Sequence, residues 1–144
     1  MKKEYPKQPI VGVGAIIIHD GKMLIVKRGS DPGKGKWSVP GGLVELGETV
    51  KEAVEREVLE ECNLKVEASH LIDIVDNIIR DKNGRIKYHF IILDFFAKLR
   101  GGKLKPNSEV IEAKWVPIDE VEKYDLTNTF REFMKRNLSK LKTQ

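Results

Sequence analysis

Three glutamates near the middle of the chain are spaced so that a helix would place them on one side. At about 100° per residue, Glu61 lies about 40° from Glu57, and Glu60 lies about 60° away on the other side. Val50 and Ala53 fall within the same arc, which sets the carboxylates beside apolar residues. Such a cluster is costly unless it is protonated or neutralised. Mg²⁺, which prefers oxygen ligands, would neutralise it. The pattern indicates a metal-binding site.

The charge distribution agrees with a bound cation but does not require one. The chain has 26 Lys and Arg against 22 Asp and Glu, a net charge of +4. Residues 45–61 contain seven acidic and two basic side chains, so this segment carries −5 and the remainder +9. A net positive charge is typical of proteins that bind nucleic acids. One dense acidic block instead suggests a cation held by carboxylates beside an anionic ligand, with a solvated acidic helix as the alternative.

The glutamates require a helix, and the flanking sequence predicts one. Thr49 and Glu52 fit a capping box at its start. Asn63 is a plausible left-handed stop. An apolar stripe at helical spacing lies between them, formed by Val50, Ala53, Val54 and Val58. Cys62 points to packing within the protein.

The remaining elements alternate between strands and turns before a final helix. Strands are expected over residues 11–18, 23–26, 64–66, 71–75, 78–79, 88–99 and 113–116, with hairpin turns at 20–21 and 81–84. Residues 29–36 form a loop and 118–122 a helical turn. The amphipathic C-terminal helix is marked by Phe130, Phe133, Met134, Leu138 and Leu141. This order favours an α+β fold built in layers.

Length and composition fit one domain of 144 residues without a membrane span. No uninterrupted apolar run exceeds four residues, as in Ala15 to Ile18, which is far shorter than the ~20 residues of a membrane helix. The start of the chain shows no secretory signal pattern. The single cysteine, Cys62, excludes an intrachain disulfide, so a cytoplasmic location is expected.

The glutamates also lie within a longer motif. Gly42, Glu48 and the run from Arg56 to Leu64 resemble the Nudix box at every defining position except one, where Asn63 replaces the usual glycine. The resemblance extends over most of residues 10–138. It implies a single Nudix hydrolase domain over residues 1–144, with its box at 42–64. The fold would be an α/β/α sandwich, with a central mixed β-sheet between the box helix and the C-terminal helix.

The same resemblance implies a pyrophosphohydrolase that cleaves a nucleoside diphosphate linked to another group, with Mg²⁺ or Mn²⁺. The positions of Glu57, Glu60 and Glu61 match the metal-binding glutamates, one of which is a candidate base. The Gly41 carbonyl matches a backbone ligand to the metal.

Further site residues follow from the resemblance. Arg56 and Glu48 match the pair that orients the catalytic glutamates. Arg56 could alternatively pair with Glu60, four residues on. Glu109 is the candidate for an additional carboxylate from a late loop, with Glu112 as the alternative.

Substrate contacts are expected around the loop that precedes the box. Phosphate contacts are assigned to basic residues that could equally be solvated, namely Lys27, Arg28, Lys34 and Lys36. Trp37 would stack on a ring or pack in the core. Asn128 resembles a base-contacting position of MutT-like members, and would alternatively cap the last helix.

The segment from Trp37 to Glu48 looks most like ADP-ribose pyrophosphatases, which predicts cleavage of ADP-ribose to AMP and ribose 5-phosphate. A proline that marks many of them is absent, and Ile78 stands there. A (d)NTP pyrophosphohydrolase of the nucleotide-pool-cleansing type is therefore the alternative. A non-catalytic nucleotide-binding module would have lost box glutamates, and a nucleic-acid binder lacks support beyond charge. The expected partner is a small nucleotide. A homodimer stays open, with Phe95 and Phe96 either at its interface or, as is expected of such a pair, packed in the core.

Overall fold

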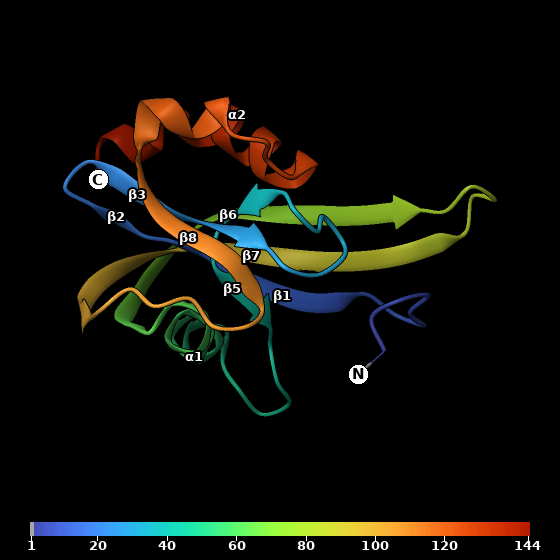
Figure 1. Ribbon diagram of the computed structural model, residues 1–144. Coiled ribbons are helices and arrows are strands. Elements are labelled where there is room, and N and C mark those ends of the chain that lie inside the picture. Colours follow the sequence, from blue (N-terminus) through green and yellow to red (C-terminus); the bar gives the residue numbers. More distant parts are fainter. Residues whose placement is uncertain (1) are drawn as a thin grey trace.

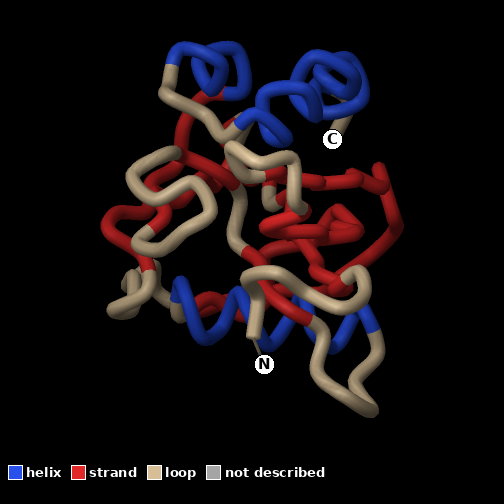
Figure 2. The backbone as a smooth tube through the Cα atoms, turned by 90° about the vertical axis from the view of Figure 1, so that its right-hand side faces the viewer, coloured by secondary structure: helices blue, strands red, loops and turns tan. Residues whose placement is uncertain are grey.

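Two helices enclose two β-sheets in the computed structural model, which describes residues 2–144 (Figure 1). The helices are α1 (Val50–Cys62) and α2 (Asn128–Lys142), and a short 3₁₀ helix η1 (Ile118–Lys123) precedes α2. The strands are β1 (Ile10–Ile16), β2 (Ile18–His19), β3 (Lys22–Arg28), β4 (Trp37–Ser38), β5 (Gly41–Leu43), β6 (Leu64–Arg80), β7 (Ile86–Gly102) and β8 (Val110–Pro117). The helices lie at opposite ends of the view in Figure 2, with the strands between them.

The central layer is divided between two four-stranded sheets. The first has the order β5-β1-β7-β6 and is mixed, because β1 runs parallel to β7 while the other pairs are antiparallel. In the second, β3 pairs antiparallel with β2, β4 and β8. The α/β/α arrangement predicted from the sequence is confirmed, and its sheet layer consists of these two sheets.

Alternate residues of the strands point to opposite helices, as the two-residue period of a strand requires. On β1 and β7, Ala15 and Phe95 belong to the core that includes the buried face of α1. Their neighbours Ile16 and Phe96 belong to the core that includes α2. The layers are therefore held by two separate apolar cores, one on each side of the strands.

Helix α1 has the predicted ends. Thr49 is its N-cap and forms the reciprocal capping box, in which each of Thr49 and Glu52 accepts a hydrogen bond from the backbone N–H of the other. The helix stops at Asn63, which adopts the left-handed conformation with φ 60°. Cys62 is buried, in agreement with the packing role predicted for it.

The predicted short strands at 64–66, 71–75 and 78–79 are wrong in extent, because they form one strand, β6, of 17 residues. Its pairing with β7 is interrupted by register shifts between Ala68 and Asp73, which break the regular alternation that marks a strand in sequence. The β6–β7 hairpin extends beyond the helices at one end of the molecule (Figure 1).

Helix α2 begins at Asn128, which was predicted as a possible cap preceding the helix. Thr127 is the N-cap, and its side chain accepts a hydrogen bond from the backbone N–H of Phe130. The alternative assignment of Asn128 as a helix cap is therefore wrong, since Asn128 is the first residue of the helix. No helix in residues 2–144 is long and apolar enough to cross a membrane.

Candidate active site

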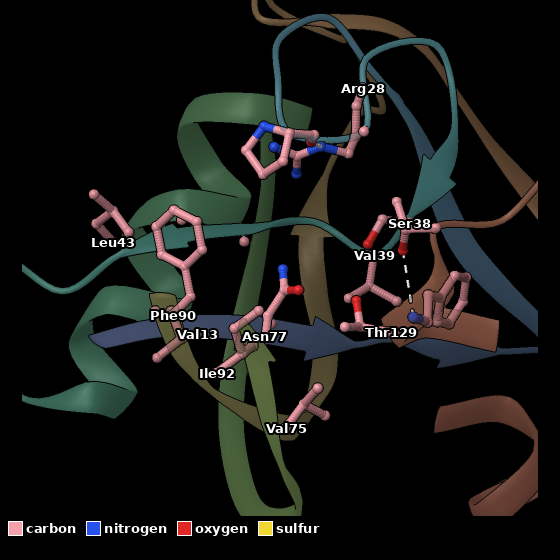
Figure 3. Close-up of a pocket in the computed structure, with 18 of the residues that line it drawn as sticks. Val13, Arg28, Ser38, Val39, Leu43, Val75, Asn77, Phe90, Ile92 and Thr129 are labelled. Atoms are coloured by element: carbon pink, nitrogen blue, oxygen red, sulfur yellow. Dashed lines mark hydrogen bonds between the residues drawn. The ribbon is translucent and has the colours of Figure 1, made fainter. Parts of the chain in front are cut away.

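A cleft of about 1010 Å³ opens between the glutamate-bearing face of α1, the 29–36 loop, and the start of α2 (Figure 3). Its lining includes Glu57, Glu60 and Glu61, so the structure brings the three predicted metal-binding residues to one cavity. The cleft also includes residues of β1, β5, β6 and β7. It is accordingly much larger than the carboxylate cluster alone.

Arg56 is the centre of the polar network at the mouth of the cleft. Its Nε and one terminal nitrogen donate to the two carboxylate oxygens of Glu48 at 2.6 and 3.0 Å. The other terminal nitrogen donates to Glu57 at 2.8 Å and to Glu60 at 3.2 Å. A further bond reaches the Leu43 carbonyl at 2.9 Å. Both pairings predicted for Arg56 are therefore present, and the planar fork fixes Glu48 and Glu57 together.

Glu57, from this network, and Glu61, which Arg56 does not contact, both pack against β5. The Glu61 carboxylate accepts a hydrogen bond from the Gly41 N–H at 3.0 Å. The Glu57 carboxylate lies where a side chain on Gly42 would stand, so that a Cβ there would overlap it. Gly42, the first residue of the motif, thus makes room for Glu57, and the Gly41 carbonyl is carried by the same backbone.

Burial makes this cluster electrostatically unusual. It raises the pKa of Glu61 to about 7, with a contribution from the nearby Glu57 and Glu109 carboxylates and opposition from Arg28. Burial also raises the pKa of Glu57, although Arg56 opposes it. Conversely, the hydrogen bonds from Arg56 lower the pKa of Glu48 to about 2. Glu48 is thus ionised and balances the charge of Arg56. The raised pKa values of Glu57 and Glu61 show that the protein itself stabilises their ionised forms less well.

The residues present suit a divalent cation. Glu57, Glu61 and the Gly41 carbonyl offer only oxygen donors, and a cation would stabilise the ionised form of both partly buried carboxylates. Mg²⁺ is commonly held by one or two carboxylates together with water and phosphate oxygens. Within residues 2–144, no three acidic, histidine or cysteine side chains already form a closed ligand group.

Of the two candidate late-loop carboxylates, the structure places only Glu109 in the cleft. Glu109 lines it and is close enough to raise the pKa of both Glu57 and Glu61. Glu112 lies on β8, where its carboxylate is 3.6 Å from the Lys114 ammonium, and it does not line the cleft. Glu60 is half exposed at the rim.

Only two of the four basic residues expected to contact phosphate line the cleft. Arg28 lines the cleft, where its Nε donates to the Pro32 carbonyl at 2.7 Å. Lys27 is adjacent on β3 and does not line the cleft, and the pairing of β3 with β8 shifts its register between these two residues. Lys36 lines the cleft at 3.8 Å from Asp125, and Lys34 does not line it.

Trp37 and Asn128, the two residues expected to contact the nucleobase, lie in different environments. Trp37 is only 7% exposed, belongs to the α2 core and meets Tyr124 edge-on with ring centroids 5.3 Å apart. It has no free ring face for a substrate, so the structure supports the alternative core role. Asn128 is exposed at the start of α2 and lines the cleft.

Sequence reasoning missed the inner floor of the cleft. Figure 3 shows Val75, Asn77, Phe90 and Ile92 lining this region from β6 and β7. Asp94 lies further along β7 and also lines the cleft. The available signal was the acidic residue itself, because Asp94 interrupts an otherwise apolar run from Phe90 to Ala97.

Comparison with known proteins fits this geometry. The model of the NUDIX domain family matches residues 8–136. An ADP-ribose pyrophosphatase of Methanocaldococcus jannaschii is 36% identical over 129 residues, which are 88% of this chain and 74% of that protein. A MutT-like protein of Streptomyces ambofaciens is 32% identical over 116 residues, 81% of this chain and 68% of the other. The crystal structure of a MutT protein from Methanosarcina mazei Go1 superposes with a TM-score of 0.79 at 28% identity, covering 94% and 97% of the two chains.

The chain belongs to the NUDIX domain family. It is a Nudix hydrolase, a pyrophosphohydrolase that acts on phosphorus-containing anhydrides in small nucleotide substrates. Nudix hydrolases generally use divalent metal ions, and the oxygen-donor set described above fits that chemistry.

Proposed function

We propose that this enzyme hydrolyses ADP-ribose to AMP and ribose 5-phosphate in the presence of Mg²⁺. The observation that carries the proposal is the arrangement of Glu57 and Glu61, held by Arg56 and the Gly41 N–H at the mouth of a cleft of about 1010 Å³. A cleft of this size accommodates a nucleoside diphosphate and a second sugar. The similarity to an ADP-ribose pyrophosphatase supports this choice among diphosphates.

In this mechanism, Glu57, Glu60, Glu61 and the Gly41 carbonyl would hold the metal, and Glu109 would add a carboxylate from the late loop. A bound divalent ion polarises phosphoryl oxygen and lowers the pKa of bound water. Arg56 keeps Glu57 oriented, because its guanidinium is fixed on the other side by Glu48. One of the three box glutamates accepts the proton of the attacking water.

Substrate phosphates would be held at the opposite wall of the same mouth. The Arg28 guanidinium lies there, close enough to Glu61 for the charge of that carboxylate to act on it. Burial lowers the pKa of Arg28, which shows a partly desolvated cation. A diphosphate placed between Arg28 and the metal would have its charge compensated on both sides. Lys36 adds positive charge at the rim.

A panel of substrates tests the choice of ADP-ribose. Purified protein with Mg²⁺ is incubated with ADP-ribose, NADH, dinucleoside polyphosphates, sugar nucleotides and (d)NTPs, and the products are identified by mass spectrometry. The highest kcat/KM is expected for ADP-ribose, with AMP and ribose 5-phosphate in equal amounts. Faster turnover of a (d)NTP would identify a pool-cleansing enzyme instead, and chelation of the metal should abolish activity in either case.

Replacement of the glutamates tests the assigned site. Glu61→Gln and Glu60→Gln should each lower kcat by about 100-fold or more while the fold is retained, since each removes a charged oxygen ligand. Glu55→Gln is the matched control, because Glu55 lies on the same helix but accepts a hydrogen bond from the Ala68 N–H on β6. Full Mg²⁺-dependent activity in both site variants would contradict the mechanism.

A further inference from the structure

Asp94 is the one acidic or basic side chain in residues 2–144 that is buried, and neither the metal site nor the phosphate contacts use it. It is 6% exposed. No group in the described part of the chain donates a hydrogen bond to its carboxylate, in contrast to the other buried polar residue, Asn137, whose amide donates at 2.8 and 3.0 Å. A buried carboxyl group without a partner is costly to a fold.

The carboxylate faces the cleft and is not sealed in the core. No fully enclosed side-chain oxygen or nitrogen in residues 2–144 lacks a hydrogen-bond partner, so the Asp94 oxygens retain contact with open space. That space is the cleft, which Asp94 lines. The carboxylate extends over β1, because a Cβ on Gly14 would overlap its Oδ1. The glycine therefore gives the Asp94 oxygens access to the cavity.

The position of Asp94 relative to the metal site follows from the strand register. Gly41 on β5 pairs with Gly14 on β1, and Gly14 pairs with Asp94 on β7. Neighbouring strands are about 4.8 Å apart, so the Asp94 backbone is about 10 Å from that of Gly41. This separation suits a substrate whose diphosphate lies at the glutamates and whose ring lies further in.

The walls beside Asp94 are suited to a flat ring. Ile92, Val75 and Val39 contribute apolar side chains (Figure 3). Gly12 and Gly14, which have no side chain, also line the cleft. An apolar slot with a single unpartnered polar group orients a ring by its hydrogen-bonding edge. Such a group also rejects analogues that leave it unpaired.

We propose that Asp94 is a specificity-determining residue, whose carboxyl oxygen accepts a hydrogen bond from the exocyclic amino group of the substrate's adenine base. This inference rests on the proposed function for the identity of the base. It adds a contact in the inner cleft that is separate from the phosphate and metal groups. The neighbouring Asp73 does not serve this role, because Arg136 and Asn137 on α2 both donate to its carboxylate at 2.8 Å.

The test compares adenine with purine, in which hydrogen replaces the 6-amino group. Affinities for AMP and purine riboside 5′-monophosphate are measured by calorimetry with Mg²⁺ present, and kcat/KM is measured for ADP-ribose and its purine analogue. The wild-type protein should prefer adenine by about 10-fold or more. In Asp94→Ala the preference should fall to near 1, because the acceptor is gone. Asp94→Asn should retain much of it, since its amide keeps a carbonyl oxygen.

Asp73→Asn is the matched control, an acidic neighbour across the strand pair that should alter stability but not base preference. An unchanged preference in Asp94→Ala would overturn the proposal, as would an equal loss of affinity for both nucleotides. The two proposals fail separately. Hydrolysis of ADP-ribose with no effect of Asp94 on base preference refutes only this one. Asp94-dependent binding of AMP without ADP-ribose hydrolysis refutes only the proposed activity.

Discussion

At the scale of single residues, the site is organised by pairs in which a small residue makes room for a carboxylate. Gly42 leaves the space that Glu57 fills, and Gly14 leaves the space that Asp94 fills. Arg56 then fixes Glu57 through a fork of hydrogen bonds shared with Glu48. The space for each carboxylate is therefore provided by a neighbouring strand, β5 for Glu57 and β1 for Asp94, while the bond from Arg56 to Glu57 lies within α1.

Gly42→Ala should therefore inactivate the enzyme without unfolding it. The added methyl group would overlap the Glu57 carboxylate, which must move away from its place beside Gly42. A displacement of about 1 Å in a catalytic group can cost about 100-fold in rate, so we expect kcat to fall by about 10- to 100-fold. The kinetics should be compared with Gly101→Ala, where a Cβ meets nothing within 4 Å. Equal activity in the two variants would show that Glu57 needs no such space.

At the scale of elements, helix α1 is specified largely by its own sequence. Its capping box and its left-handed end both involve residues close together in the chain. The same local repeat that buries Ala53, Val54 and Val58 carries Glu57 and Glu61 to the edge of the buried face. The capped ends therefore fix where the helix starts and stops, and so which residues of the helix face the cleft.

The left-handed end at Asn63 yields a stability prediction. Alanine is strained at φ 60°, whereas glycine is not. Both substitutions remove the hydrogen bond that the Asn63 amide donates to the Lys103 carbonyl at 3.0 Å. The difference between them thus isolates the backbone strain. Urea denaturation should give a free energy of unfolding about 1 kcal/mol lower for Asn63→Ala than for Asn63→Gly. Equal values would mean that α1 ends differently in solution.

At the scale of the whole molecule, the strands divide the protein into an α1 side and an α2 side, and the cleft joins them at β5. The parallel pairing of β1 with β7 brings Gly14 beside Asp94, although they are 80 residues apart in sequence. The pairing of β6 with β7 places Asp73 on the other side of Asp94. The environment of this one carboxyl group therefore depends on three strands and on α2.

This environment predicts a pH dependence of stability. Burial and the neighbouring Asp73 charge raise the pKa of Asp94 from 3.8 to about 7, with Arg136 opposing. The folded protein consequently holds a proton that the unfolded chain releases above pH 3.8. The free energy of unfolding contributed by Asp94 falls as the pH rises from about 4 to 7, by up to about 1.4 kcal/mol per pH unit.

Denaturation of wild type and Asp94→Asn across this range, without ligand, isolates the effect. The stability of Asp94→Asn relative to wild type should increase between pH 4 and 7 and level off above the folded pKa, because asparagine has no proton to lose. A constant difference over the range would contradict the raised pKa. Asp73→Asn should remove part of the charge that raises the pKa of Asp94, and so narrow the pH range over which Asp94 lowers the stability.

Much of the fold could be predicted because its signals are local. Turns, helix ends and apolar repeats each involve a few consecutive residues, and these placed most elements correctly. The long strand β6 was an exception, because its register shifts interrupt the two-residue alternation. Strand β5 at residues 41–43 was not predicted, and the strand predicted over 11–18 is divided into β1 and β2. Among site residues, Glu57, Glu60, Glu61 and Arg56 share one helix, so helical geometry alone relates them in space.

The sequence by itself determined the carboxylate patch, the ends of its helix and the family motif, since all three depend on spacing along one short segment. Only the tertiary structure decided that Arg28 and not Lys27 faces the cleft, and that Trp37 belongs to the core. It also placed Asp94 at the inner wall. These outcomes depend on which strands pair and in which register. Contacts between distant segments set both, and the spacing of neighbouring residues does not record them.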